Sequence, residues 1–168
     1  MRPKPSSIVI ALTLTLAIVA ADVANAFSGS GSLSGTSRLR VSGCGAYRAN
    51  FSGTLLVGID GTWIAQVEDG SFAGTSTPVG RSGRKIRLAL DAPSTAALVA
   101  SIAEDISTTC ELPSVTVTSS RPKGLTLALD RTLTKAKFII KYALKGTAGD
   151  HSGTATYKLL GRGPWTAR

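Results

Sequence analysis

Apolar and polar residues alternate along most of the chain after residue 35. In segment 85–91, Ile86, Leu88 and Leu90 share one face, and mostly charged residues share the other. In Lys135–Lys145 every second residue is apolar, namely Ala136, Phe138, Ile140, Tyr142 and Leu144. Alternation with one apolar face indicates half-buried antiparallel strands. The same pattern predicts strands at Arg38–Val41, Tyr47–Ile59, Thr62–Glu68, Ser71–Thr77, Val115–Thr118, Leu125–Leu129 and Thr154–Leu160.

Short turns separate these segments. Asp60-Gly61 and Asp69-Gly70 are typical hairpin dipeptides, and Pro78–Gly83 is a longer loop rich in glycine. Because short connections join neighbouring strands, the strands are expected to run antiparallel. The sequence therefore predicts an all-β, mainly antiparallel fold, a small eight- or nine-stranded β-barrel, with a β-sandwich as the alternative.

Four segments share a small residue followed by Gly and Thr. Their glycines are Gly35, Gly53, Gly74 and Gly153, at irregular spacings that do not make a tandem repeat. Glycine inside a strand marks a bulge or a tight bend, which helps a sheet to coil toward closure. This favours the barrel over the sandwich, although chance in a glycine-rich chain is an alternative explanation.

One segment has the period of a helix. Asp91 is a capping residue, and Pro93 follows it in the first turn. Leu98, Ile102 and Ile106 then recur at intervals of four and form an apolar stripe. We predict one helix at about 93–106, with its apolar stripe against the barrel.

The first 26 residues have the features of a signal peptide. Arg2 and Lys4 precede an uncharged apolar run over residues 8–21, and Ala24-Asn25-Ala26 fits the rule for cleavage. The run is too short to span a bilayer comfortably, so an uncleaved anchor is the weaker alternative. We therefore expect a secreted or periplasmic protein without a transmembrane segment after cleavage. Residues 27–35 are rich in Gly and Ser and predict a flexible tether, followed by a single β domain over 36–168.

The chain has two cysteines, Cys44 and Cys110. Cysteine pairs in exported proteins are generally oxidised, so we predict a disulfide that fixes the C-terminal end of the helix. The alternatives are two buried thiols or an intermolecular bond. Two cysteines and a single histidine are too few for the usual zinc ligands, and we expect no metal site.

The chain is basic, with 19 Lys and Arg against 10 Asp and Glu and a formal net charge of +9. Such a charge favours contact with anionic glycans, lipids or other polyanions. The candidate residues are Arg81, Arg84, Lys85, Arg87, Lys135, Lys137, Lys141 and Lys145. The alternative is a solvated face that only keeps the protein soluble or guards against edge-to-edge aggregation. Nothing indicates specific nucleic-acid binding, since Phe138 and Tyr142 lie on the face opposite the lysines.

Catalytic motifs are missing from the sequence. It contains no nucleophile elbow, no phosphate-binding loop and no paired-histidine metal motif. His151 follows Asp150 directly, and adjacent residues of a strand point to opposite faces, so we expect His151 at a hairpin turn instead. Gly61-Thr62-Trp63 resembles the Gly-x-Trp signature of lipocalins but lies on roughly the third strand, so no residue role is carried over. We expect neither an enzyme nor a cofactor.

Three functions remain as hypotheses. In the first, the barrel interior binds a small apolar ligand, with the helix as a lid. The cavity candidates are Trp63, Ala65, Phe138, Tyr142 and Tyr157. Small residues clustered at one end of the barrel would leave space there, whereas small residues interleaved with large ones would give a packed core. In the second hypothesis the basic outer face docks on an anionic partner. The third is a structural or protein-partner role.

Overall fold

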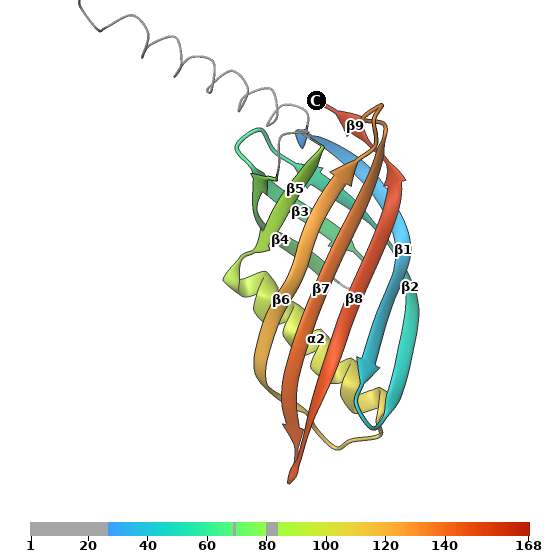
Figure 1. The fold of residues 1–168 in the computed structure, drawn as a ribbon, viewed down its shortest axis with the longest axis vertical. Coiled ribbons are helices and arrows are strands. Elements are labelled where there is room, and N and C mark those ends of the chain that lie inside the picture. Colours follow the sequence, from blue (N-terminus) through green and yellow to red (C-terminus); the bar gives the residue numbers. More distant parts are fainter. Residues whose placement is uncertain (1–26, 69, 80–83) are drawn as a thin grey trace, which may run out of the picture.

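The computed structural model describes residues 27–68, 70–79 and 84–168. Its elements are β1 (Gly29–Val41), β2 (Gly45–Val57), β3 (Thr62–Val67), β4 (Gly70–Pro78), β5 (Lys85–Leu90), α2 (Ala92–Thr109), β6 (Thr116–Leu129), β7 (Lys135–Ala148), β8 (His151–Pro164) and β9 (Thr166–Ala167). The strands form one antiparallel sheet in the order β2-β3-β4-β5-β6-β7-β8-β1-β9. Because β1 also pairs with β2, eight strands close into a barrel (Figure 1). The predicted barrel is confirmed.

The alternating pattern determines which side chains face the core. Ile86 and Leu88 in β5 are buried while Lys85 and Arg87 are exposed, as the alternation predicts. The five alternate apolar residues of β7 are all buried. At one end of the barrel, Phe27 before β1 and Trp165 after β8 are 2% and 4% exposed and extend this core.

Close contact between strands explains three of the four recurring glycines, since a Cβ atom added to Gly53 in β2 would overlap the carbonyl oxygen of Gln66 in β3. A Cβ atom added to Gly35 in β1 would overlap the carbonyl oxygen of Leu160 in β8. A Cβ atom added to Gly74 in β4 would overlap the carbonyl oxygen of Ala89 in β5. These glycines therefore allow neighbouring backbones to approach closely. The pairing register runs without a shift at Gly35 and Gly74, so the bulge predicted for such glycines is not present at these two positions.

Two predicted boundaries are wrong, and one short strand was not predicted. Residues 27–35 are not a tether, because Phe27 is buried and β1 begins at Gly29, where it pairs with the end of β2. The two strands expected at 115–118 and 125–129 are one strand, β6, in which register shifts at Val117/Ser119 and Pro122/Gly124 preserve the pairing with β7. A short strand, β9, follows Trp165 and pairs with the start of β1. These segments consist largely of small and polar residues, which give no strand signal in the sequence, and pairing with neighbouring strands stabilises them.

Helix α2 packs on the core with the predicted stripe. Leu98, Ile102 and Ile106 are buried, and the Asp91 side chain accepts a hydrogen bond from the Ser94 backbone N–H, which caps the helix. The Ser94 hydroxyl in turn accepts a 2.8 Å hydrogen bond from the Ala73 backbone N–H of β4. β5 pairs with β6 at only three positions, and Figure 1 shows α2 starting beside β4 and β5 and passing across the lower half of the barrel. The helix therefore covers the part of the core that the short strands β3, β4 and β5 leave open.

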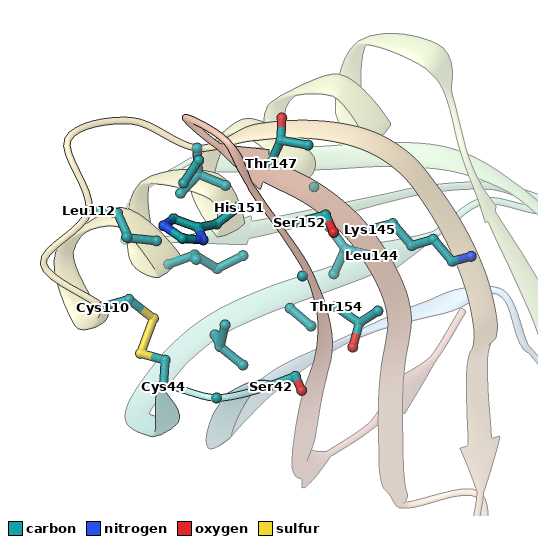
Figure 2. Close-up of a pocket in the computed structure, with 18 of the residues that line it drawn as sticks. Ser42, Cys44, Cys110, Leu112, Leu144, Lys145, Thr147, His151, Ser152 and Thr154 are labelled. Carbon is teal, nitrogen blue, oxygen red and sulfur yellow. A yellow bond between two sulfur atoms is a disulfide. The ribbon is translucent and has the colours of Figure 1, made fainter.

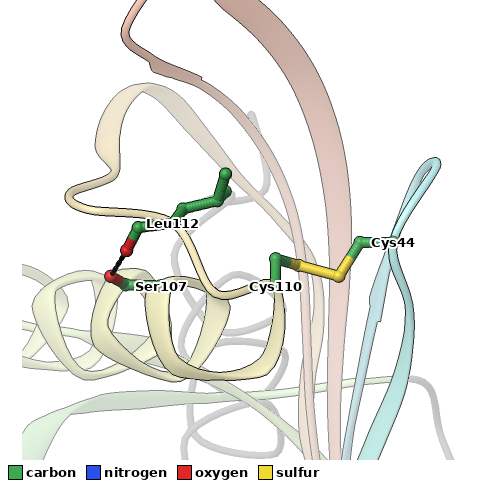
Figure 3. Close-up of a disulfide and its surroundings, with 4 residues drawn as sticks. All are labelled: Cys44, Ser107, Cys110 and Leu112. Carbon is green, nitrogen blue, oxygen red and sulfur yellow. Dashed lines mark hydrogen bonds between the residues drawn. A yellow bond between two sulfur atoms is a disulfide. The ribbon is translucent and has the colours of Figure 1, made fainter.

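The predicted disulfide joins Cys44 and Cys110, whose Cα atoms are 5.7 Å apart. Cys44 lies in the turn between β1 and β2, and Cys110 caps the C-terminal end of α2 (Figure 3). The bond therefore ties the end of the helix to the barrel wall at the end opposite Phe27 and Trp165.

Candidate functional site: a pocket beside the disulfide

A pocket of about 470 Å³ lies at the disulfide end of the barrel. Its walls come from the β1–β2 turn, the end of α2, the segment that leads into β6, and the β7–β8 hairpin (Figure 2). Apolar side chains form much of its lining, including Val41, Ile106, Leu112, Val115, Val117 and Leu144. Four of these side chains are only partly buried, namely Val41, Leu112, Val115 and Val117. The apolar surface that they form is therefore accessible. Its volume is within the range of small-molecule sites.

Small residues of the β7–β8 hairpin line this space. Gly146 pairs with Gly153, and the inward positions next to them are Ala148 and Ala155. A Cβ atom added to Gly153 would meet no atom within 4 Å, unlike one added to Gly35 or Gly74. Gly153 is therefore not required by a close backbone contact, and it leaves the pocket open. The small residues are clustered at one end of the barrel here, which is the arrangement expected to leave space.

Polar groups surround the apolar lining. His151 pairs with Ala148 at the two-residue β7–β8 turn, so the prediction that it lies at a hairpin turn is confirmed. Its exposed side chain lines the pocket together with Ser42 (Figure 2). Glu111 and Thr109 also line the pocket. The site therefore combines an apolar interior with hydrogen-bonding groups at the edge.

The loop after α2 has a strained residue at the pocket. Glu111 has a φ of 53°, in the left-handed region that favours glycine. The Leu112 backbone N–H donates to the Ser107 carbonyl, and the Ser107 hydroxyl donates to the Leu112 carbonyl over 2.6 Å (Figure 3). With the bond from the Glu111 N–H to the Thr108 carbonyl, this is the Schellman arrangement that ends helices. The loop thus places Leu112 and Glu111 beside the disulfide.

The five residues predicted to line a cavity lie elsewhere, in the packed interior. Trp63, Ala65, Phe138, Tyr142 and Tyr157 are all buried, and none of them lines the pocket beside the disulfide. The rings of Trp63 and Phe138 meet edge to face with centroids 6.1 Å apart. Large and small residues interleave at this level of the barrel. The ligand-binding role predicted for these five residues stays a prediction.

The two buried tyrosines are close to polar residues of the helix. Burial raises the pKa of Tyr142, and a hydrogen bond with the Thr95 side chain opposes that effect. Burial, together with the nearby Asp105 carboxylate, raises the pKa of Tyr157 to about 12. Since Tyr142 and Tyr157 pair across β7 and β8, they form a support on the barrel wall for α2. Polar residues of α2 therefore lie beside two of the five residues that were predicted to line a cavity.

The predicted basic residues fall on separate strands. Lys85 and Arg87 lie on β5, whereas the four lysines at positions 135, 137, 141 and 145 are exposed on β7, with β6 between them. Arg84 is half-buried just before β5, and Arg81 lies outside the described residues, as does the predicted signal peptide. β7 instead meets further basic residues on β8, because Lys141 pairs with Lys158 and Lys137 with Arg162.

These neighbours were missed because strand order is not visible in one sequence. The alternation over Thr154–Leu160 already indicates that Lys158 points outward, but only the register places it against Lys141. Arg38 of β1 pairs with Lys158 from the other side. The basic surface therefore extends over three adjacent strands, β7, β8 and β1.

Within the described residues, no three or more His, Cys, Asp or Glu side chains gather closely enough to hold a metal ion. None of the helices in that part of the chain has the length and apolar character needed to cross a membrane. Comparisons with models of protein families, with curated proteins and with solved structures find no match to this chain.

Proposed function

We propose that this protein binds a small, largely apolar molecule with one polar end in the pocket beside the Cys44–Cys110 disulfide. Binding is non-enzymatic and takes place outside the cytoplasm, in a secreted or periplasmic protein. The observation that carries the proposal is the accessible apolar lining, kept open by Gly153 and its small neighbours. Partly exposed apolar side chains around a concave site gain free energy when a ligand removes them from water.

The polar groups at the edge favour a ligand with one polar end. His151, Glu111 and Thr109 offer both donors and acceptors, whereas the lining deeper in the pocket is aliphatic. A fatty acid or another small amphiphile has this distribution of polar and apolar groups. The disulfide supports the location, since such bonds persist in oxidising compartments.

Filling the pocket is the direct test. Gly153→Phe adds a ring where an added Cβ meets no atom within 4 Å, and phenylalanine is favoured over glycine in strands. The protein expressed from the full chain is titrated with a fluorescent fatty-acid analogue. We expect the wild type to bind the analogue saturably. The substitution should weaken the affinity at least about tenfold, because the added ring removes most of the apolar contact with the ligand.

The matched control is Gly124→Phe. Gly124 lies in β6, an added Cβ there also meets no atom within 4 Å, and the residue does not line the pocket. This variant is expected to bind like the wild type. Wild-type protein that does not bind the analogue, or equal affinities for the two variants, would refute the proposed site. Urea denaturation of each variant shows whether it is folded.

A further inference from the structure

Six residues on the outer face of β7 and β8 form a regular arrangement, which we call the β7–β8 patch. Its three cross-strand pairs are Lys137–Arg162, Ile139–Leu160 and Lys141–Lys158. The four cationic residues are exposed, and the aliphatic pair between them is half-buried. Two pairs of cations thus enclose a partly exposed aliphatic centre.

The pairing of like charges is unfavourable for the fold. Opposite-charge pairs stabilise a sheet when they face each other, whereas like charges directly opposite destabilise it. Both basic pairs of the patch have this unfavourable arrangement, and Arg38 of β1 adds a further cation opposite Lys158. A surface that only had to be soluble could alternate the two signs of charge. The arrangement therefore fits an anionic partner that neutralises these residues.

Acidic residues do not offset this charge from the neighbouring strands. In the described part of the chain, none of the nine strands contains Asp or Glu. The outward neighbours in β6 and β1 are Gly124, Thr126, Ala128, Ser34, Thr36 and Arg38. The line of paired residues that runs across the sheet from Arg162 passes through Ser34 of β1 and then Ser52 of β2. The first acidic residue along this line is Glu68, which accepts a hydrogen bond from the Ser52 hydroxyl.

The aliphatic centre distinguishes between the anionic partners. An acidic glycan or a nucleic-acid backbone would contact the cations but would gain little from Ile139 and Leu160. Recognition of single-stranded nucleic acid would also use aromatic side chains, and the patch has none. The surface of an anionic bilayer offers both partners, since head groups bind cations and the acyl boundary accepts aliphatic side chains.

We infer that the β7–β8 patch docks the protein on an anionic lipid bilayer. The patch lies on two adjacent strands, so its side chains point in similar directions and reach one flat surface together. This inference does not depend on the pocket, because the patch is on the outside of the barrel. Docking would hold the barrel wall against the bilayer while the pocket at the disulfide end keeps its own opening.

Co-sedimentation with vesicles tests the inference. Protein expressed from the full chain is mixed with vesicles of phosphatidylcholine alone, or of phosphatidylcholine with phosphatidylglycerol. We expect binding to the anionic vesicles only, and weaker binding as salt rises. The double variant Lys141→Gln/Lys158→Gln should partition about 25-fold less, because each surface lysine contributes about fivefold. Its denaturation midpoint should be unchanged or higher, since a like-charge pair is removed.

Two controls separate the patch from charge in general and from glycan binding. Lys85→Gln/Arg87→Gln removes the same charge from β5, two strands away, and should leave vesicle binding nearly unchanged. Ile139→Thr should weaken vesicle binding without changing retention on heparin. Equal losses of vesicle binding in the two charge variants would overturn the inference. Retention on heparin without vesicle binding would also overturn it and would identify an acidic glycan as the partner. Gly153→Phe should bind vesicles like the wild type.

Discussion

Removal of the disulfide should destabilise this barrel more than any single surface change. Cys44 and Cys110 are 66 residues apart in sequence, and the bond closes this loop in the unfolded chain. In the chain-entropy description, closing such a loop lowers the entropy of the unfolded state enough to stabilise the fold by about 4 kcal/mol. Domains are typically stable by about 5–15 kcal/mol, so the double variant Cys44→Ala/Cys110→Ala should stay folded but lose a large part of its stability.

Urea denaturation at neutral pH measures the loss. With a slope of about 2 kcal/mol per molar urea, a change of about 4 kcal/mol lowers the midpoint by about 2 M. Wild-type protein reduced and alkylated after unfolding should refold to a similar midpoint, because it lacks the same constraint. Hydrogen exchange should also rise in residues 106–115, where the bond holds the end of α2 against the β1–β2 turn.

A small loss would refute this reasoning. If the double variant lost less than about 1 kcal/mol, the loop would already be closed by residual structure in the unfolded state, and the entropy calculation would not apply. A large loss with an unchanged exchange rate at the end of α2 would support the entropic effect but contradict the local role of the bond.

Two further predictions concern single residues. Tyr157 keeps its proton in the folded protein up to a pKa of about 12, whereas the unfolded chain loses it near 10, so stability should fall between these pH values by up to about 3 kcal/mol. Tyr157→Phe should reduce this decline of the urea midpoint at alkaline pH. The control Tyr47→Phe, at a side chain that is 43% exposed, should leave the decline unchanged. Equal declines in the two variants would contradict the burial argument. Glu111→Gly relieves a left-handed residue and should raise the free energy of unfolding by about 1 kcal/mol. A lower midpoint for this variant would show that the Glu111 side chain makes a stabilising contact.

The class of fold could be predicted because alternation is a local signal. The apolar residues of β7 and β5 indicate the buried face without knowledge of any partner strand. The helix was predictable for the same reason, since Asp91, Pro93 and the stripe from Leu98 to Ile106 are local features. The disulfide followed from the presence of two cysteines and the signs of export.

Segments without strong side-chain signals could not be predicted. Residues 29–35 are Gly and Ser apart from Leu33, and they form a strand because β2 on one side, with β9 and then β8 on the other, supply their hydrogen bonds. The middle of β6 contains Pro122 and Gly124, which usually end a strand, yet bulges preserve its pairing with β7. In both cases the backbone pairing outweighs the local preference of the residues.

In the strands with a clear alternation, such as β5 and β7, the sequence by itself determined which residues face inward or outward, because that depends only on the period of two. Only the tertiary structure decided which strands are neighbours, and therefore that Lys158 and Arg162 lie against Lys141 and Lys137. It also decided that Thr95 and Asp105 of α2 lie beside Tyr142 and Tyr157, and that the pocket lies at the β7–β8 hairpin with its two glycines. Register and packing depend on contacts between residues far apart in the chain, and a single sequence does not contain that information in local form.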